Sequence, residues 1–202
     1  LLDQFNKCGF TPRVVVCYHG GEPLLDTNLE NRIARLKRMG VEKTVIVTNA
    51  SQLTIERSKK LLAAGLDELQ ASFDGCTPDE NDEQRLNGNF AKDAANLRGF
   101  LKLRKKHLNK PNVVVSNIRL LDEATFKATA KKDSDITQFA DVPKYLLDYF
   151  NGFLNDIHFQ SFQAMAWPAA SHNSAYYDIV TLPMNEYKSC VIPFETITIR
   201  YD

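Results

Sequence analysis

The sequence predicts an α/β protein built on a parallel sheet. Five short apolar runs have the length of buried strands, and a helical pattern of apolar residues follows each of the first four. Strands that alternate with helices in this way form parallel sheets with right-handed crossovers. Polar residues follow the end of every expected strand, which is where ligand sites lie in parallel α/β folds.

The first, second and fourth expected strands are continuous runs rich in β-branched residues. This pattern is typical of parallel strands that are covered on both faces. The strands are expected at residues 13–18, 43–48, 68–73, 112–118 and 156–162.

Helical stripes separate the expected strands, and Gly40 and Gly65 end the first two of them. The stripes are expected over residues 29–39, 54–62, 90–107 and 145–153. Two segments break the alternation. Residues 121–141 are polar and contain three lysines, which favours a solvated excursion. Residues 166–189 are expected to form an ordered connection that leads out of the repeat.

The composition is that of an ordinary globular chain. Of the 202 residues, 44% are apolar and 25% are charged, which argues against a disordered or fibrous protein. The 25 basic and 25 acidic side chains balance, so there is no electrostatic reason to expect nucleic acid or membrane partners. No apolar run reaches membrane-spanning length. We expect a cytoplasmic protein, and both ends of the sequence suggest a fragment of a longer chain.

The four cysteines show no C-x-x-C spacing, so they predict no metal knuckle closed within this sequence. They are expected to stay reduced in a chain without a signal peptide. For Cys8, Cys17 and Cys76 we expect small buried hydrophobic residues.

The polar residues at the strand ends form the most informative pattern. Carboxyl ends of parallel strands meet at one edge of a sheet, so these residues together favour a site there. Each one alone is better explained as a helix cap or a turn residue, and only the set favours a site. They are His19 and Glu22, Thr48 and Asn49, Ser72 and Asp74, Ser116 and Asn117, and Gln160 and Gln163.

The segment Gly20-Gly21-Glu22-Pro23 stands out among them. Two glycines permit left-handed backbone and a close approach by a ligand, while Pro23 suits the start of a helix. Backbone carbonyls beside the carboxylate of Glu22 suit a cationic group such as a primary ammonium. The alternative is a tight turn with an exposed glutamate. Neither a phosphate loop nor G-x-G-x-x-G occurs, so nucleotide phosphates are not indicated.

In several ordered motifs the chain resembles the radical S-adenosylmethionine enzymes, and the resemblance covers nearly its whole length. The last motif resembles the start of a SPASM extension, a cysteine-rich module that holds an auxiliary iron-sulfur cluster. The motifs are residues 18–25 (the GGEP segment), 47–54 (T-N-G-x-x-L-T), 64–75 (A-G-L-D and S-x-D-G), 81–90 (H-D-x-x-R and G-x-F) and 190–202.

The chain also departs from the family pattern. The C-x-x-x-C-x-x-C segment that holds the catalytic cluster is absent, and it would be expected before Leu1. Ala50 stands in place of a glycine, and Asn81 stands where the family often has histidine.

The resemblance implies a partial (β/α)₆ barrel of which strands two to six are present. It divides the chain into a radical S-adenosylmethionine core at residues 1–165, a connection at 166–189 and the start of a SPASM-like module at 190–202. In this family a reduced [4Fe-4S] cluster converts S-adenosylmethionine into a 5′-deoxyadenosyl radical, which abstracts hydrogen from a peptide, sugar or other small substrate. A flavodoxin or ferredoxin is the implied reducing partner.

The resemblance also implies roles for single residues. Gly20, Gly21 and Glu22, with Pro23 behind them, would hold the methionine amino group. Ser72 and Arg85 would meet the methionine carboxylate, with the arginine as a charged fork. Asn117 would contact ribose or adenine, whereas Asn49 and Asp74 either contact the cofactor or shape turns. Cys190 would be a ligand of the auxiliary cluster. No catalytic residue is expected within this sequence.

Two other readings remain open. In the second reading, the chain is a degenerate relative that has lost its cluster and serves as a binding or scaffold subunit. An ordinary (β/α)₈ aldolase or hydrolase is the third reading. It would need a lysine or a pair of carboxylates at the strand ends, and the sequence offers neither convincingly.

Overall fold

The structure is a computed structural model that describes residues 7–9, 11–17, 21–85, 87–108, 110–122, 124–125, 128 and 137–165. The expected SPASM-like segment and Cys190 therefore lie outside the described residues, as do His19 and Gly20. Among the described residues, no helix is long and apolar enough to cross a membrane.

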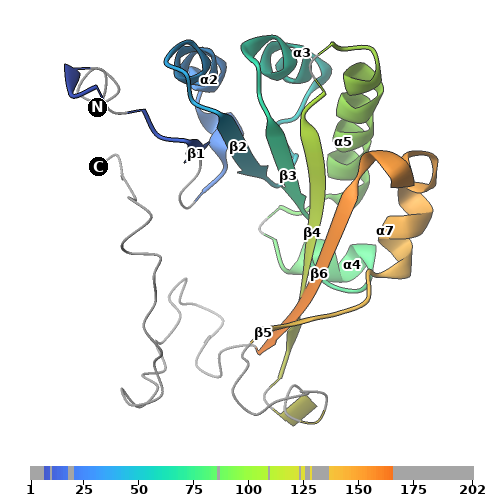
Figure 1. Ribbon diagram of the computed structural model, residues 1–202. Helices are drawn as coiled ribbons and strands as arrows, with labels where there is room; N and C mark the ends of the chain where they lie inside the picture. The colour runs from blue at the N-terminus through green and yellow to red at the C-terminus, as the bar shows by residue number, and fades with distance from the viewer. Residues whose placement is uncertain are drawn as a thin grey trace, which may run out of the picture.

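A six-stranded sheet forms the centre of the molecule (Figure 1), in the order β1-β2-β3-β4-β6-β5. The pairs β1–β2, β2–β3, β3–β4 and β4–β6 are all parallel. This confirms the five predicted strands and their direction. The short strand β5 pairs antiparallel with β6 and was not predicted, because three residues within a polar segment carry no readable period. The strands are β1 (Val14–Val16), β2 (Lys43–Thr48), β3 (Glu68–Ser72), β4 (Asn112–Leu121), β5 (Thr137–Phe139) and β6 (His158–Met165).

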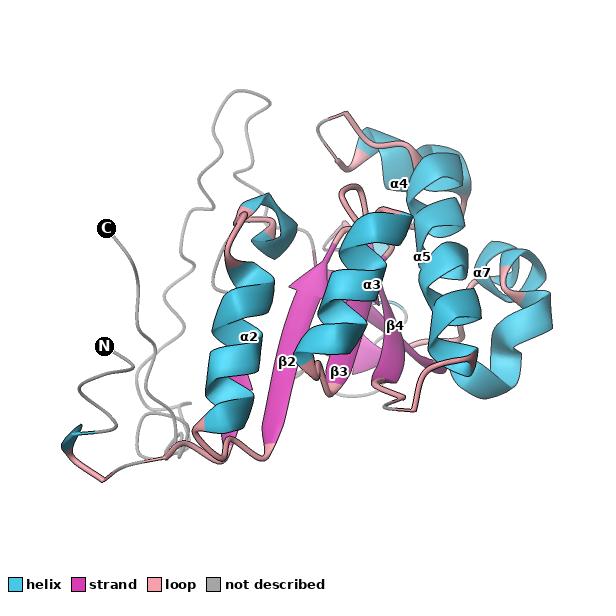
Figure 2. Cartoon of the chain, turned by 90° about the horizontal axis from the view of Figure 1, so that it is seen from above, coloured by secondary structure: helices cyan, strands magenta, loops and turns pink. Residues whose placement is uncertain are grey.

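Four helices agree with the predicted stripes, and Figure 2 shows α2, α3 and α5 side by side along one face of the sheet. Local chemistry sets their ends. Thr54 caps α3 by accepting a hydrogen bond from the Arg57 backbone N–H, and Gly65 ends it at φ +84°. The elements are α2 (Leu29–Arg38), α3 (Ile55–Ala64), α5 (Phe90–Lys105), α7 (Lys144–Tyr149), and the 3₁₀ turns η1 (Pro23–Leu25) and η2 (Asn151–Asp156).

Helix α4 (Pro78–Glu83) is an addition to the predicted elements. It covers part of the segment between β3 and α5. Its signal was present in the sequence, because Thr77-Pro78 followed by Glu80 matches a helix start. The Thr77 hydroxyl accepts a hydrogen bond from the Glu80 N–H at 3.1 Å. The helix is only six residues long and lacks an apolar stripe, which is why periodicity missed it.

The main core lies between the sheet and these helices. Ile46 and Val115 face the helices and are fully buried. Alternation along a strand places Val45 and Val114 on the opposite face, where they are also buried. The expectation of two covered faces is therefore confirmed for β2 and β4. It is wrong for the edge strand β1 within the described residues, where Val14 is 54% exposed.

Candidate functional site

Glu22 ties the turn after β1 to the carboxyl end of β2. Its Oε1 accepts hydrogen bonds from the Thr48 hydroxyl at 2.7 Å and from the Leu24 backbone N–H at 3.0 Å. Its Oε2 accepts a hydrogen bond from the Asn49 backbone N–H at 2.8 Å. Three donors thus hold the carboxylate, so its position at the rim of the sheet is fixed.

Gly21 shows why the turn needs glycine. Its φ is +86°, in the left-handed region that favours glycine. A Cβ built at this position would meet no atom within 4 Å, so the backbone at Gly21 is open to a neighbour. Pro23 begins η1 directly after Glu22. The fold therefore leaves room for a ligand to approach the backbone here.

The turn after β2 has a related conformation. Ala50 has φ +63° and is fully buried, which explains physically why a glycine suits this position of the family pattern. The Thr48 hydroxyl accepts a hydrogen bond from the Ala50 N–H, and Asn96 of α5 donates one to the Ala50 carbonyl. The Asn49 side chain accepts a hydrogen bond from the Ser51 N–H at 2.9 Å. Of the two roles left open for Asn49, the structure shows the turn-shaping one.

Arg85 folds back from the segment after α4 to the end of β3. Its Nη2 donates to the Ser72 hydroxyl at 3.1 Å and to Asp74 Oδ2 at 2.7 Å. The side chain is 18% exposed, and its Nε–H is buried without a hydrogen-bond acceptor among the described residues. The expected placement of Arg85 over Ser72 is confirmed, and one buried N–H of the guanidinium remains without an acceptor.

Asn117 has an internal role in the structure. The residue is 1% exposed, and its Nδ2 donates to the carbonyls of Phe73 and Gly75, both at 2.8 Å. Its Oδ1 accepts a hydrogen bond from Ser161 at 2.9 Å. Both amide hydrogens are thus used to hold the loop that carries Asp74. The contact with ribose or adenine stays a prediction.

The register of the sheet separates Asn117 from Ser72. Ser72 pairs with Ser116, and Ser116 pairs with Gln160, so these three lie in one row on one face. Asn117 follows Ser116 and points to the other face. The strand-end residues were expected to form one site, but the register places the Asn117 side chain on the face of the sheet opposite to that of Ser72. The alternation of side chains along the strand could have identified Ser116, rather than Asn117, as the residue on the same face as Ser72.

Asp93 is a member of the site that sequence reasoning missed. It lies in the first turns of α5, is 6% exposed, and makes no side-chain hydrogen bond or ion pair with a described residue. Burial raises the pKa of its carboxyl to about 6; the charges of Asp82 and Glu22 act in the same direction, and those of Lys92 and Arg85 oppose them. The sequence feature that could have revealed Asp93 is the position of a charged residue within the apolar stripe of a predicted helix.

The described residues offer no site for an iron-sulfur cluster. Within them, no group of three or more histidine, cysteine, aspartate or glutamate side chains is placed to hold a metal ion. Burial raises the pKa of Cys17 to about 11, so its thiol is neutral. The residue is half-buried against the core, so the expectation of a buried Cys17 is confirmed in part. Cys8 is exposed, so the expectation that it is buried is wrong.

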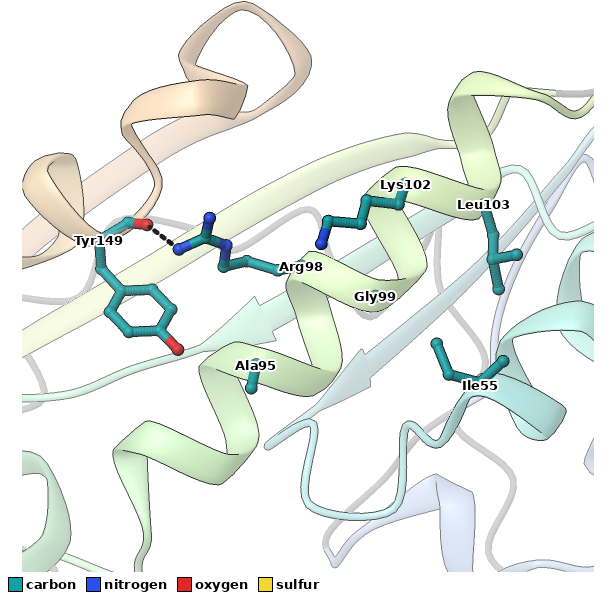
Figure 3. A pocket seen from close by; sticks show the side chains of 7 residues that line it. All are labelled: Ile55, Ala95, Arg98, Gly99, Lys102, Leu103 and Tyr149. Carbon is teal, nitrogen blue, oxygen red and sulfur yellow. Dashed lines mark hydrogen bonds between the residues drawn. The ribbon is translucent and has the colours of Figure 1, made fainter.

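A pocket lies away from the rim, on the outer helical layer (Figure 3). Its volume is about 530 Å³, and Arg98 beside it donates a hydrogen bond to the Tyr149 carbonyl at 3.1 Å. None of the expected site residues lines it. The lining residues are Ile55, Ala95, Arg98, Gly99, Lys102, Leu103 and Tyr149.

A curated protein is similar to about a third of the chain. The GTP 3′,8-cyclase of Limosilactobacillus fermentum (strain NBRC 3956 / LMG 18251) is 39% identical over 72 residues, which are 35% of this chain and 21% of the cyclase. The match thus spans about a fifth of that relative.

Two solved structures are similar at low identity. The crystal structure of Streptococcus suis SuiB matches with a TM-score of 0.45 and 16% identity, over 79% of this chain and 41% of SuiB. ChuY, an anaerobillin reductase from Escherichia coli O157:H7, matches with a TM-score of 0.34 and 11% identity, over 81% of this chain and 89% of ChuY.

The family assignment comes from the sequence model of the Radical SAM superfamily, which matches residues 1–131. That span contains β1 to β4, the Glu22 turn, and the contacts among Ser72, Asp74 and Arg85. The chain therefore belongs to the Radical SAM superfamily.

Proposed function

We propose that this chain forms the S-adenosylmethionine-binding part of a radical S-adenosylmethionine enzyme. The observation that carries the proposal is the position of Arg85, which lies over Ser72 with a buried Nε–H that lacks an acceptor. A buried, unpaired donor on a charged group is costly, and a ligand carboxylate would supply the missing acceptors. Membership of the superfamily supports S-adenosylmethionine as that ligand.

The residues at the rim fit the amino-acid end of this cofactor. Arg85 and Ser72 would bind the methionine carboxylate. Glu22 accepts hydrogen bonds from three internal donors and is thereby fixed beside the glycine turn, where its carboxylate would attract the methionine amino group. The methionine amino group would then meet the open backbone of Gly21; the role that the resemblance implies for Gly20 stays part of the proposal.

The charge of the rim supports the same ligand. Glu22, Asp74, Asp82 and Asp93 contribute carboxylates, and Arg85 is the cation that pairs with Asp74 there. S-Adenosylmethionine carries a sulfonium and an ammonium against one carboxylate. Carboxylates near an arginine suit that distribution, because the carboxylates attract the cations and the arginine binds the carboxylate.

The chemistry of the whole protein is part of the proposal. Bound S-adenosylmethionine, together with a reduced [4Fe-4S] cluster, supplies the radical that abstracts hydrogen from a peptide, sugar or other small substrate. We propose that the cluster ligands lie outside the described residues, that Cys190 is one ligand of an auxiliary cluster in a SPASM-like module, and that a flavodoxin or ferredoxin delivers the electron in the cytoplasm.

Calorimetric titration of S-adenosylhomocysteine into the chain tests the cofactor site. This ligand keeps the carboxylate and the amino group and is chemically stable. We expect binding by the parent chain, and a loss of about 1.5–3 kcal/mol in Arg85→Ala, because a charged hydrogen bond disappears. The exposed Arg38 of α2 gives the control, and Arg38→Ala should bind like the parent. Equal affinity of Arg85→Ala and the parent would reject the role of Arg85, and no binding by the parent would reject the site.

A further inference from the structure

Arg98 of α5 is a half-buried arginine without a carboxylate partner among the described residues. Arg57, Arg85 and Arg104 are also withdrawn from water, and each pairs with a carboxylate, at 2.9, 2.7 and 3.2 Å. Arg98 instead donates one hydrogen bond, from Nη1 to the Tyr149 carbonyl at 3.1 Å. The other N–H groups of its guanidinium are therefore left for an anion, which is the partner that this fork of donors binds most strongly.

A second cation lies beside Arg98 in the outer pocket of about 530 Å³ (Figure 3). Lys102 follows Arg98 by four residues, so both side chains lie on the same side of α5. Lys102 has no ion-pair partner among the described residues, and no acidic side chain is among those that line the pocket. Like charges at this spacing repel each other, and an anion bound between them would relieve that repulsion.

The opposite side of the pocket is apolar. Ile55, at the start of α3, is 51% exposed there, and Figure 3 shows the Leu103 side chain of α5 pointing toward it. Gly99 allows the two helices to approach this closely, because a Cβ built on it would lie only 2.8 Å from Ile55 Cδ1. The pocket therefore offers a ligand a cationic side and an apolar side.

The cationic side is held in position by Tyr149. The Tyr149 ring centroid lies 5.3 Å from the guanidinium carbon of Arg98, in addition to the hydrogen bond to its carbonyl. The ring itself packs against Phe90 and Phe150 at centroid distances of 5.2 and 5.4 Å, and its hydroxyl donates to the Ala91 carbonyl at 3.3 Å. The guanidinium is thus ordered before a ligand arrives, which lowers the entropy cost of binding.

We propose that this pocket binds a small organic anion with an apolar body, such as an aromatic or aliphatic acid. The acid group would lie between Arg98 and Lys102, and the apolar body would lie against Ile55 and Leu103. The volume of the pocket is within the range of about 300–1,000 Å³ that is usual for small-molecule sites. This site goes beyond the proposed function and shares no residue with the rim of the sheet.

Two naphthalene probes test the proposal by calorimetry on the full chain. The parent should bind 2-naphthalenesulfonate at least about tenfold more tightly than the neutral 2-naphthalenemethanol, which has the same ring without the charge. Lys102→Gln should weaken sulfonate binding about threefold and Lys102→Glu about tenfold, with binding of the alcohol unchanged. Ile55→Ser should weaken both probes to a similar extent, because it removes apolar contact. The exposed Lys110, outside the pocket, supplies the control, and Lys110→Gln should match the parent.

NMR of ¹⁵N-labelled chain locates the bound sulfonate. The amide signals of Gly99 and Leu103 should shift on titration, and that of Ser72 should not. Failure of the parent to bind the sulfonate, equal affinity for the two probes, or equal sulfonate affinity of Lys102→Glu and the parent would each overturn the inference. Shifts at Ser72 with Gly99 unaffected would place the anion at the rim and also overturn it. None of these results bears on S-adenosylhomocysteine binding, so the proposed function is tested separately.

Discussion

Replacement of Asp93 by asparagine should stabilise the folded chain at neutral pH. Asp93 is 6% exposed, and burial raises the pKa of its carboxyl from 3.8 to about 6. At about 1.4 kcal/mol per pH unit this difference corresponds to at most ~3 kcal/mol. Contact with remaining solvent reduces the penalty, so we expect a gain of about 1–3 kcal/mol in Asp93→Asn, which keeps the shape and removes the charge.

The sign of the pH dependence follows from the raised pKa. The folded state binds the proton more tightly than the unfolded state, so ionisation of Asp93 opposes folding. This penalty is absent below the unfolded pKa of 3.8, grows between pH 3.8 and about 6, and is constant above. The stability advantage of Asp93→Asn should therefore appear over that interval and persist at pH 7.5.

Urea unfolding of the parent and of Asp93→Asn between pH 4 and 7.5 measures this difference directly. Both chains share all other titrating groups, so the contributions of those groups cancel in the difference between the two unfolding free energies. Asp79→Asn, on the surface of α4, should show a small difference that does not vary with pH. A constant difference between Asp93→Asn and the parent, or a variant that is less stable at pH 7.5, would refute the assignment of Asp93 as a buried acid with a raised pKa.

Two further predictions concern buried groups at the strand ends. Thr48→Val should lower the free energy of unfolding by about 1.5–3 kcal/mol, because the buried hydroxyl donates to the Glu22 carboxylate at 2.7 Å; thermal or urea unfolding measures this, and an unchanged stability would contradict it. Cys17 should react with iodoacetamide far more slowly than the exposed Cys8 at pH 8, because burial raises the pKa of Cys17 to about 11. Mass spectrometry of the labelled peptides follows both rates, and similar rates would disprove the burial of Cys17.

The sheet could be predicted from the sequence because its strands carry strong local signals. The run Lys43–Thr48 matches β2 residue for residue, since β-branched residues fill it and a helix start follows. Strand β5 and helix α4 lack such signals, because one has three residues and the other is uniformly polar. Their formation depends on neighbours that only the folded chain brings together.

The candidate site was predictable to a smaller extent. Family resemblance, not local chemistry, placed Arg85 over Ser72, and the structure confirms that placement. The internal role of Asn117 depends on the loop carbonyls of Phe73 and Gly75, which no pattern along β4 reveals. Asp93 was missed because its burial arises from packing against other elements, while the sequence shows only an acid in the first turns of a helix.

The most direct test of the account is to map where the cofactor binds. Titration of S-adenosylhomocysteine into ¹⁵N-labelled chain, followed by NMR, should shift the amide signals of Gly21 and Ser72 and the Nε–H signal of Arg85. Signals from the outer pocket, such as that of Gly99, should stay unchanged. Shifts that cluster around Gly99 and Leu103, with Gly21, Ser72 and Arg85 unaffected, would contradict the central claim that the rim of the sheet binds the cofactor.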